Sequence, residues 1–259
     1  MNKVQSQGIP LKKKFGQHFL RDQSIVDAAI ERVDLTHASV FEIGGGDGFL
    51  TRSILQASVD RLWVFEIDPD WATYLQTSID DERLSIKHEN ILDVDFSIFD
   101  SHKPWTLLAN LPYQITFPIF HLLYKHRALL KEGVVMVQEE VAQKLVKTRG
   151  KGYGFPSLFF NHYFELELLQ KILPTAFLPP PKVYSRLIYL KPKTTVPVIP
   201  DEPEFWKFIK ICFAQPRRTL RNNLMQTHYD MTKISSEILV LRAQQLKMED
   251  FLQIWESIL

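Results

Sequence analysis

The chain has 259 residues, of which 45% are hydrophobic and 24% are charged, and its formal net charge is +1. This is ordinary for a globular protein with a sizeable core, either one large domain or a large and a small one. A single cysteine, Cys212, excludes a disulfide framework, and no apolar run approaches the roughly 20 residues that span a bilayer. No signal-peptide pattern begins the sequence, so we expect a cytoplasmic protein without membrane contact.

The first two thirds of the sequence alternate between strand and helix patterns. This alternation predicts an α/β domain built on a mostly parallel sheet with helices on both faces. The expected strands are residues 40–43, 62–67, 84–87, 105–109 and 133–138. The expected helices are residues 22–33, 49–57, 71–78, 118–124 and 140–147, the first capped by Asp22 or Ser24.

The pattern changes towards the C-terminus. Adjacent prolines make residues 178–182 stiff and extended, and residues 183–190 alternate like a closing strand. Residues 191–203 are rich in Pro, Thr and Lys, as a linker is, and from Glu204 onward only helical spacing is found. We therefore expect an α/β domain over residues 1–195 and a small helical domain over residues 196–259.

A glycine loop follows the first expected strand. Glycines at 44, 45, 46 and 48 let the backbone approach a ligand, but their spacing does not fit the dinucleotide fingerprint. The loop fits the E-x-G-x-G-x-G pattern of methyltransferases instead. Glu66 ends the next strand, where its carboxylate is placed to accept hydrogen bonds from both ribose hydroxyls of a cofactor. A purely structural turn is the alternative for the loop alone.

The sequence Asn110-Leu111-Pro112-Tyr113 follows the fourth expected strand, at the same edge as the glycine loop. Asn and Pro are common in turns, so a structural role is possible. The position suits methylation of an exocyclic adenine amine, a weak nucleophile. The Asn110 side-chain oxygen and the Pro112 carbonyl would accept its two hydrogens and stabilise the developing charge, while Tyr113 stacks on the extruded base. We expect no metal ion.

Five blocks of the sequence, in order, resemble the ribosomal RNA adenine N6-dimethyltransferase family. They are Lys14-Phe15-Gly16-Gln17-His18-Phe19-Leu20, the glycine loop with Glu66, Asn110 to Tyr113, Pro174 to Ser185 with its Ala-Phe-Leu-Pro-Pro-Pro-Lys-Val core, and Phe213 to Leu224. The resemblance covers nearly the whole chain.

The resemblance implies a Rossmann-like class I methyltransferase sheet with a small C-terminal all-helical domain that binds RNA. The implied reaction transfers methyl groups from S-adenosylmethionine to two adjacent adenosines in the 3′-terminal hairpin loop of 16S ribosomal RNA, within the small subunit or its precursor. Tyr113 and Phe177 would sandwich the adenine, although Phe177 could instead be a core residue. The implied cofactor contacts are His18, Leu20, Gly44, Glu66, Asn90 and Asn110. We expect a monomer.

Some residues depart from the family pattern. Asn90 stands where an acid is usual, so Glu89 or Asp93 could take its place at the cofactor. Gln114 replaces the usual Asn. Phe155 replaces the arginine of a Tyr-Gly-Arg-Leu-Ser segment, which removes one possible RNA contact.

Two basic clusters are expected to contact RNA phosphates, although either could be an ordinary solvated face. They are Lys12, Lys13 and Lys14, and Arg217, Arg218 and Arg221 with Lys207 and Lys210 nearby. Two alternatives stay open: a large-subunit (23S) enzyme of the antibiotic-resistance type, and a ribosome-assembly factor whose methylation is secondary. A DNA adenine methyltransferase fits less well, since those tend to carry Asp at the position of Asn110.

Overall fold

The computed structural model describes residues 5–259, with the side chain of Lys13 excepted. The chain divides into two compact units, Met1–Ala142 with Glu165–Pro192, and Gln143–Phe164 with Lys193–Leu259. The second boundary lies close to the division that we expected after residue 195. The second unit differs from the expectation because it also takes in residues 143–164.

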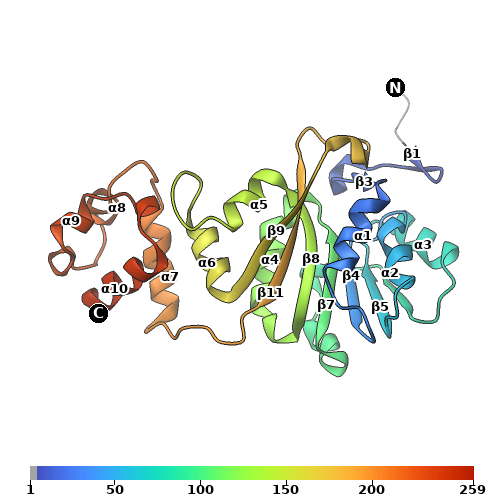
Figure 1. The fold of residues 1–259 in the computed structure, drawn as a ribbon, viewed down its shortest axis with the longest axis horizontal. Helices are drawn as coiled ribbons and strands as arrows, with labels where there is room; N and C mark the ends of the chain where they lie inside the picture. Colours follow the sequence, from blue (N-terminus) through green and yellow to red (C-terminus); the bar gives the residue numbers. More distant parts are fainter. Residues whose placement is uncertain (1–4) are drawn as a thin grey trace. The chain divides into compact units, whose positions relative to one another are not determined.

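The first unit is built on a seven-stranded sheet (Figure 1). In spatial order its strands are β6 (Leu84–Lys87), β5 (Arg61–Phe65), β4 (Ser39–Ile43), β7 (Trp105–Asn110), β8 (Leu130–Gln138), β11 (Ser185–Pro192) and β9 (Phe164–Ile172). The five strands from β6 to β8 are parallel, and β11 is antiparallel to β8. The expected α/β class and mostly parallel sheet are confirmed.

The helices of this sheet begin near the predicted positions. They are α1 (Gln23–Glu31), α2 (Phe49–Leu55), α3 (Pro69–Ser78), α4 (Thr116–Lys125) and α5 (Glu139–Leu145). The Asp22 side chain accepts the Ser24 N–H at 3.1 Å and so caps α1, as predicted. Asp68 caps α3 in the same way, and Pro69 occupies its first turn, where a missing N–H costs nothing.

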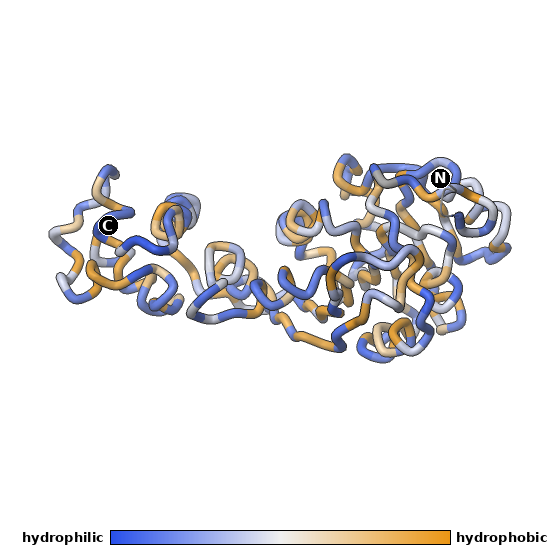
Figure 2. The backbone as a smooth tube through the Cα atoms, turned by 90° about the horizontal axis from the view of Figure 1, so that it is seen from above, coloured by the Kyte–Doolittle hydropathy of each residue, from blue (hydrophilic) through white to orange (hydrophobic). Residues whose placement is uncertain are grey.

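Burial follows the position of each strand in the sheet. Every residue of β4 is buried, as in a strand whose two faces are both covered, while the edge strands β6 and β9 are half-buried or exposed over most of their length. Figure 2 shows the apolar stretches running through the interior of this unit, with polar stretches in the connections. Each fully buried Val, Leu or Ile side chain stabilises such a core by roughly 1.5–3 kcal/mol.

Two short strand pairs lie outside the large sheet. Strand β1 (Gln5–Ser6) pairs with β2 (Ile9–Pro10), and β3 (Phe19–Leu20) pairs antiparallel with β10 (Phe177–Leu178). The second pair joins an N-terminal segment to the proline-rich segment that precedes β11. Both segments thereby reach the carboxyl edge of the sheet.

The second unit is helical. It contains α6 (Phe155–Tyr163), α7 (Glu202–Cys212), α8 (Leu220–Leu224), α9 (Ser236–Leu239) and α10 (Met248–Ile258). Its aromatic core includes Phe205, Phe208 and Trp255. The centroid of the Trp255 ring lies 5.8 Å from that of Phe205 and 5.6 Å from that of Phe208. The expected C-terminal helices are confirmed, whereas α6 and β9 were not predicted. Within residues 5–259, no helix has the length and apolar character needed to cross a bilayer.

Candidate active site

A cleft of about 210 Å³ lies where β4, β5 and β7 end. The register places Ile43 beside both Phe65 and Ala109, so the three parallel strands end at one edge of the sheet. The glycine loop, Glu66 and the Asn110–Tyr113 turn therefore meet there, as predicted. Residues 14–19 of the N-terminal segment and residues 89–92 line the rest of the cleft.

The glycine loop needs its glycines for conformation and for space. Gly44 and Gly46 have φ values of +79° and +53°, which side-chain-bearing residues rarely adopt. A Cβ on Gly46 would lie 3.0 Å from the Phe19 ring, which closes over the loop. The bare backbone leaves room for a ligand between the loop and the N-terminal segment.

Glu66 is buried at the wall of the cleft. Its carboxylate accepts the Gly46 N–H at 2.9 Å and the Asp68 N–H at 2.8 Å, one at each oxygen. Each oxygen keeps a second lone pair, so the group can still accept hydroxyl donors, as a ribose would supply. Burial raises the pKa of Glu66, while the backbone hydrogen bonds oppose this shift.

Asn110 connects the end of β7 with the N-terminal segment. Its side-chain N–H donates to the His18 carbonyl at 3.0 Å. This bond fixes the orientation of the amide, and among residues 5–259 no donor to the Asn110 side-chain oxygen is found within hydrogen-bond distance. The His18 ring in turn donates from Nδ1 to the Pro179 carbonyl at 2.7 Å. The arrangement leaves one oriented acceptor, the Asn110 Oδ1, at the cleft.

The Tyr113 ring lies beside His18, with centroids 6.0 Å apart and ring planes 21° from parallel. Its hydroxyl shares a 2.6 Å hydrogen bond with the buried Ser185 hydroxyl. Burial raises the pKa of Tyr113, so the phenol stays protonated at neutral pH and is no base. The Pro112 carbonyl already accepts the Ile115 N–H at 3.1 Å, which leaves it one lone pair.

Phe177 does not line the cleft. Its side chain is 4% exposed and belongs to the core cluster that also contains Leu20 and Ile25. This position matches the core-packing alternative, and a sandwich role would require the ring to leave the core. Phe177 pairs with Leu20 in the β3–β10 ladder, so it positions the segment that carries His18.

The other expected cofactor residues have different surroundings. Leu20 is 7% exposed and borders a second cavity rather than the main cleft. Asn90 and Glu89 both line the main cleft. The Asn90 amide caps the following turn through Leu92 N–H at 3.2 Å and donates to Asp93 at 2.8 Å, so Asp93 is engaged with Asn90.

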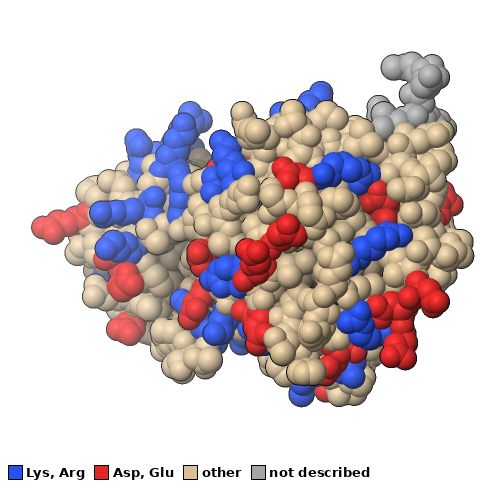
Figure 3. Space-filling view, turned by 45° about the vertical axis from the view of Figure 1, so that its right-hand side comes forward, with Lys and Arg blue, Asp and Glu red and all other residues tan. Residues whose placement is uncertain are grey.

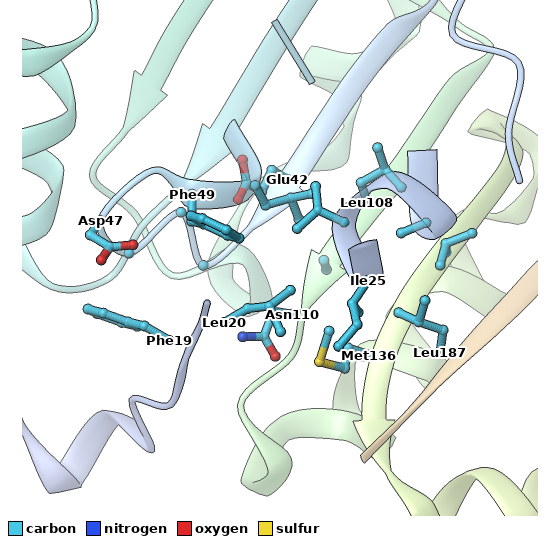
Figure 4. Close-up of a pocket in the computed structure, with 18 residues that line it drawn as sticks. Phe19, Leu20, Ile25, Glu42, Asp47, Phe49, Leu108, Asn110, Met136 and Leu187 are labelled. Atoms are coloured by element: carbon cyan, nitrogen blue, oxygen red, sulfur yellow. The ribbon is translucent and has the colours of Figure 1, made fainter. Parts of the chain in front are cut away.

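The second cavity, of about 50 Å³, lies beside the glycine loop and is shown in Figure 4. Ile25, Leu108, Met136 and Leu187 form its apolar wall, and Asn110 borders both cavities. Glu42 also lines it; its carboxyl accepts the Thr51 hydroxyl hydrogen at 2.7 Å. Burial raises the pKa of Glu42 to about 8.

Two acids that hold the N-terminal segment were missed by the sequence analysis. Asp68 accepts from Lys12 at 2.5 Å and from Gln17 at 2.9 Å. Asp47 accepts from Ser6 at 2.8 Å and from Arg21 at 2.5 Å. Both acids lie in or next to blocks that the sequence analysis singled out, but nothing in a linear pattern shows which distant residues they contact.

The predicted RNA-binding residues divide into two groups. Lys12 is paired with Asp68 and Asp70, and Lys207 with Glu204. Within residues 5–259, no acid lies within 4.0 Å of the exposed side chains of Arg217, Arg218 and Arg221. Lys14 is exposed over the Phe15 ring and Lys210 lies over the Phe155 ring, at 4.5 and 4.9 Å, while Lys13 falls outside the described side chains.

Phe155, the departure from the family arginine, is part of the helical unit. Its ring packs against Phe159 and Trp206 at centroid distances of 5.3 and 6.0 Å. The side chain thus contributes to packing of α6 on α7, and the ammonium of Lys210 supplies a positive charge next to it.

Comparison with solved structures supports the fold. A dimethyladenosine transferase from Plasmodium falciparum superposes with a TM-score of 0.77 at 21% identity, covering 92% of this chain and 96% of that chain. The 23S rRNA methyltransferase ErmE superposes with a TM-score of 0.70 at 20% identity, covering 93% and 99%. At these identities the likeness is one of fold.

Comparison of sequences goes further. Chlorobium phaeobacteroides has a protein named ribosomal RNA small subunit methyltransferase A that is 34% identical over 252 residues, 96% of this chain and 92% of that protein. The protein of the same name from Chlorobium chlorochromatii is 35% identical over 256 residues. The model of the ribosomal RNA adenine dimethylase family matches residues 9–259. The chain therefore belongs to the ribosomal RNA adenine dimethylase family, whose enzymes use S-adenosylmethionine.

Proposed function

We propose that the chain transfers methyl groups from S-adenosylmethionine to N6 of two adjacent adenosines in the 3′-terminal hairpin loop of 16S ribosomal RNA. The product is N6,N6-dimethyladenosine, and the substrate is the small subunit or its precursor. The names of the curated relatives support the small subunit as the source of the RNA. A monomeric state and a cytoplasmic location stay predictions.

The observation that carries the proposal is the oriented Asn110 amide. Its N–H is taken by the His18 carbonyl, so its oxygen is left as an acceptor at the cleft. An adenine amine placed there donates one hydrogen to Asn110 and the other to the remaining lone pair of the Pro112 carbonyl. Both contacts strengthen as positive charge develops on the nitrogen, and no strong base is needed first.

The remaining residues position the reactants. S-adenosylmethionine, when bound, supplies an already activated methyl group. Glu66 would accept the ribose hydroxyls of the cofactor, and Gly44, His18 and Asn90, which line the same cleft, would contact the rest of it. Tyr113 stacks on the extruded adenine with its hydroxyl anchored to Ser185. Phe177 acts from the core, by holding the β3–β10 pair in place.

The exposed arginines of the helical unit supply the phosphate contacts. Figure 3 shows Lys and Arg side chains gathered on one part of the surface, at the upper left of that view. Arg217, Arg218 and Arg221 have no acidic partner in the described chain, so each guanidinium is free to bind a phosphate.

The test is transfer of radiolabelled methyl from S-adenosylmethionine to unmethylated small ribosomal subunits, with large-subunit RNA alongside, followed by nucleoside analysis. Labelled N6,N6-dimethyladenosine from the small subunit alone is the expected result. Label in the large-subunit RNA would establish the resistance-type alternative. No label in either would leave the assembly-factor alternative, and such a factor would bind its precursor equally well after Asn110→Ala.

A further inference from the structure

Exposed apolar side chains concentrate in one segment of the first unit. Of the ten large hydrophobic residues that are exposed within residues 5–259, four lie between positions 173 and 184. They are Leu173, Leu178, Val183 and Tyr184, which are 58%, 39%, 43% and 44% exposed. Single exposed apolar residues are normal on a protein surface, but such a concentration next to a reaction site indicates a contact surface.

Tyr184 lies at the carboxyl edge of the sheet, one residue before β11. Its carbonyl accepts the Glu139 N–H at 2.9 Å, just beyond the end of β8. The next residue, Ser185, is fully buried and bonds the Tyr113 hydroxyl at 2.6 Å. Successive strand residues point to opposite sides, so the Tyr184 ring is exposed while its neighbour anchors the residue proposed to stack on the target base.

The charges around this ring are positive. The Lys171 ammonium lies over the Tyr184 ring, 4.1 Å from its centroid, and Lys182 is exposed on the same segment. The carboxylate of the neighbouring Glu139 is bound by Arg186, with contacts of 2.5 and 3.1 Å. An exposed aromatic ring next to unneutralised ammonium groups is the combination that binds unpaired nucleotides: the ring stacks on a base and the ammonium contacts the phosphate.

We propose that Tyr184 and Lys171 bind the nucleotide next to the target adenosine while that adenosine occupies the reaction site. This rests on the proposed function, in which the substrate is RNA with two adjacent target adenosines. Extrusion of one base leaves its neighbour without a stacking partner, and the Tyr184 ring supplies one. The positive charge and the continuity with Tyr113 favour RNA over a protein partner.

The test compares Tyr184→Ala, Tyr184→Phe and Lys171→Gln in methyl transfer to unmethylated small subunits. Loss of the ring should raise KM for the subunit roughly 5- to 150-fold, the range of base–aromatic stacking. The value of kcat at saturating subunit and the Kd for S-adenosylmethionine should change less than about twofold. Tyr184→Phe should behave as the wild type, because stacking needs the ring alone.

Lys171→Gln tests the ammonium group. It should lower the slope of log Kd for the RNA against log salt by about 0.7, the value for one single-strand phosphate contact.

Matched controls separate the possible outcomes. Ile98→Ala removes another 40% exposed apolar side chain, away from this segment, and should leave KM unchanged. A hairpin RNA that lacks the base next to the target should bind the wild type as weakly as the normal hairpin binds Tyr184→Ala, with no further loss when both changes are combined. An unchanged KM in Tyr184→Ala, or an equal loss in Tyr184→Phe, overturns the proposal.

The proposal and the proposed function fail in different ways. If the wild type methylates no small-subunit RNA, the proposed function fails before Tyr184 is tested. If Tyr184→Ala loses affinity for assembled subunits but not for protein-free hairpin RNA, the surface contacts a ribosomal protein and the RNA proposal is wrong. Circular dichroism and cofactor binding identify any variant that does not fold. If Tyr184→Ala does not fold, the hairpin that lacks the base next to the target takes its place, and equal affinity of the wild type for this hairpin and for the normal one overturns the proposal.

Discussion

The carboxyl edge of the large sheet and the arginine-rich segment of the helical unit are both polar, but they are organised in opposite ways. At the edge, Lys12 forms an ion pair with Asp68 and Arg21 forms one with Asp47. The Asn110 amide donates a hydrogen bond to the His18 carbonyl. Around Arg217 and Arg218 no acid of the described residues lies close enough to neutralise the guanidinium groups. Polar groups that bond each other build a fixed geometry, whereas unpaired charges are available to a ligand. The first region suits chemistry and the second suits capture of RNA.

The largest expected effect follows from replacing Asn110 with Ala. The proposed acceptor for the adenine amine disappears, so kcat should fall roughly 100- to 1000-fold, as when one oriented hydrogen-bonding group is lost from an active site. The Kd for S-adenosylmethionine, measured by calorimetry, should rise less than about fivefold. Unchanged turnover would contradict the role of Asn110 in the reaction.

Replacing Glu66 with Ala should act on the cofactor instead. Loss of two hydrogen bonds, each worth roughly 0.5–1.5 kcal/mol net, should weaken S-adenosylmethionine binding on the order of 10- to 100-fold. Glu66→Gln is the matched control, since it keeps the shape and one acceptor oxygen and should lose less. A calorimetric Kd that equals the wild-type value in Glu66→Ala would mean that the cofactor lies elsewhere.

Glu42 allows the pH dependence of stability to be predicted. Its pKa is raised from 4.5 to about 8, so the folded state holds a proton that the unfolded state releases above pH 4.5. The contribution of this group to the free energy of unfolding is fully present below pH 4.5. It decreases as the pH rises to about 8, by up to about 1.4 kcal/mol per pH unit. Glu42→Gln should remove that slope and raise Tm at pH 8 relative to the wild type.

Thermal unfolding of both proteins between pH 5 and 8.5 measures this difference. Glu165→Gln, on an exposed position of β9, is the control and should follow the wild type throughout. Curves for Glu42→Gln that run parallel to the wild type would show that Glu42 is ionised in the fold.

The smallest effect concerns the two kinds of cation. Arg218→Gln removes an unpaired charge and should lower the slope of log Kd for RNA against log salt by close to one unit. Lys12→Gln removes a charge that is already paired with Asp68 and Asp70, so its slope should change by less than about 0.3. Equal changes of this slope in the two variants would contradict the distinction between paired cations at the sheet edge and unpaired cations in the helical unit.

Much of this arrangement could be predicted from sequence. Parallel strands end at one edge, so the glycine loop, Glu66 and Asn110 had to meet there. The sequence does not show which residues far apart in the chain contact each other. Lys12 and Arg218 look alike in a basic cluster, and only the fold shows that Asp68 neutralises the first. Phe177 sits in a family motif, but its burial depends on β3, which pairs with it from the other end of the domain.

Two of the elements that the sequence did not predict, β9 and α6, have physical explanations as well. Strand β9 is an edge strand with Glu165 and Glu167 on its exposed positions, so it lacks the apolar run of the central strands. Helix α6 has four Phe or Tyr side chains among its nine residues, and its six buried residues leave no polar face to mark a helical period. Its packing partners belong to the C-terminal unit, which is why that unit takes in residues 143–164.

The most direct test of the difference between the two regions is to measure kcat and KM for small subunits in Asn110→Ala and in the triple variant Arg217→Gln, Arg218→Gln, Arg221→Gln. We expect Asn110→Ala to lose kcat with KM nearly unchanged, and the triple variant to raise KM with kcat nearly unchanged. The account is contradicted if Asn110→Ala changes KM alone, or if the triple variant loses kcat at saturating subunit.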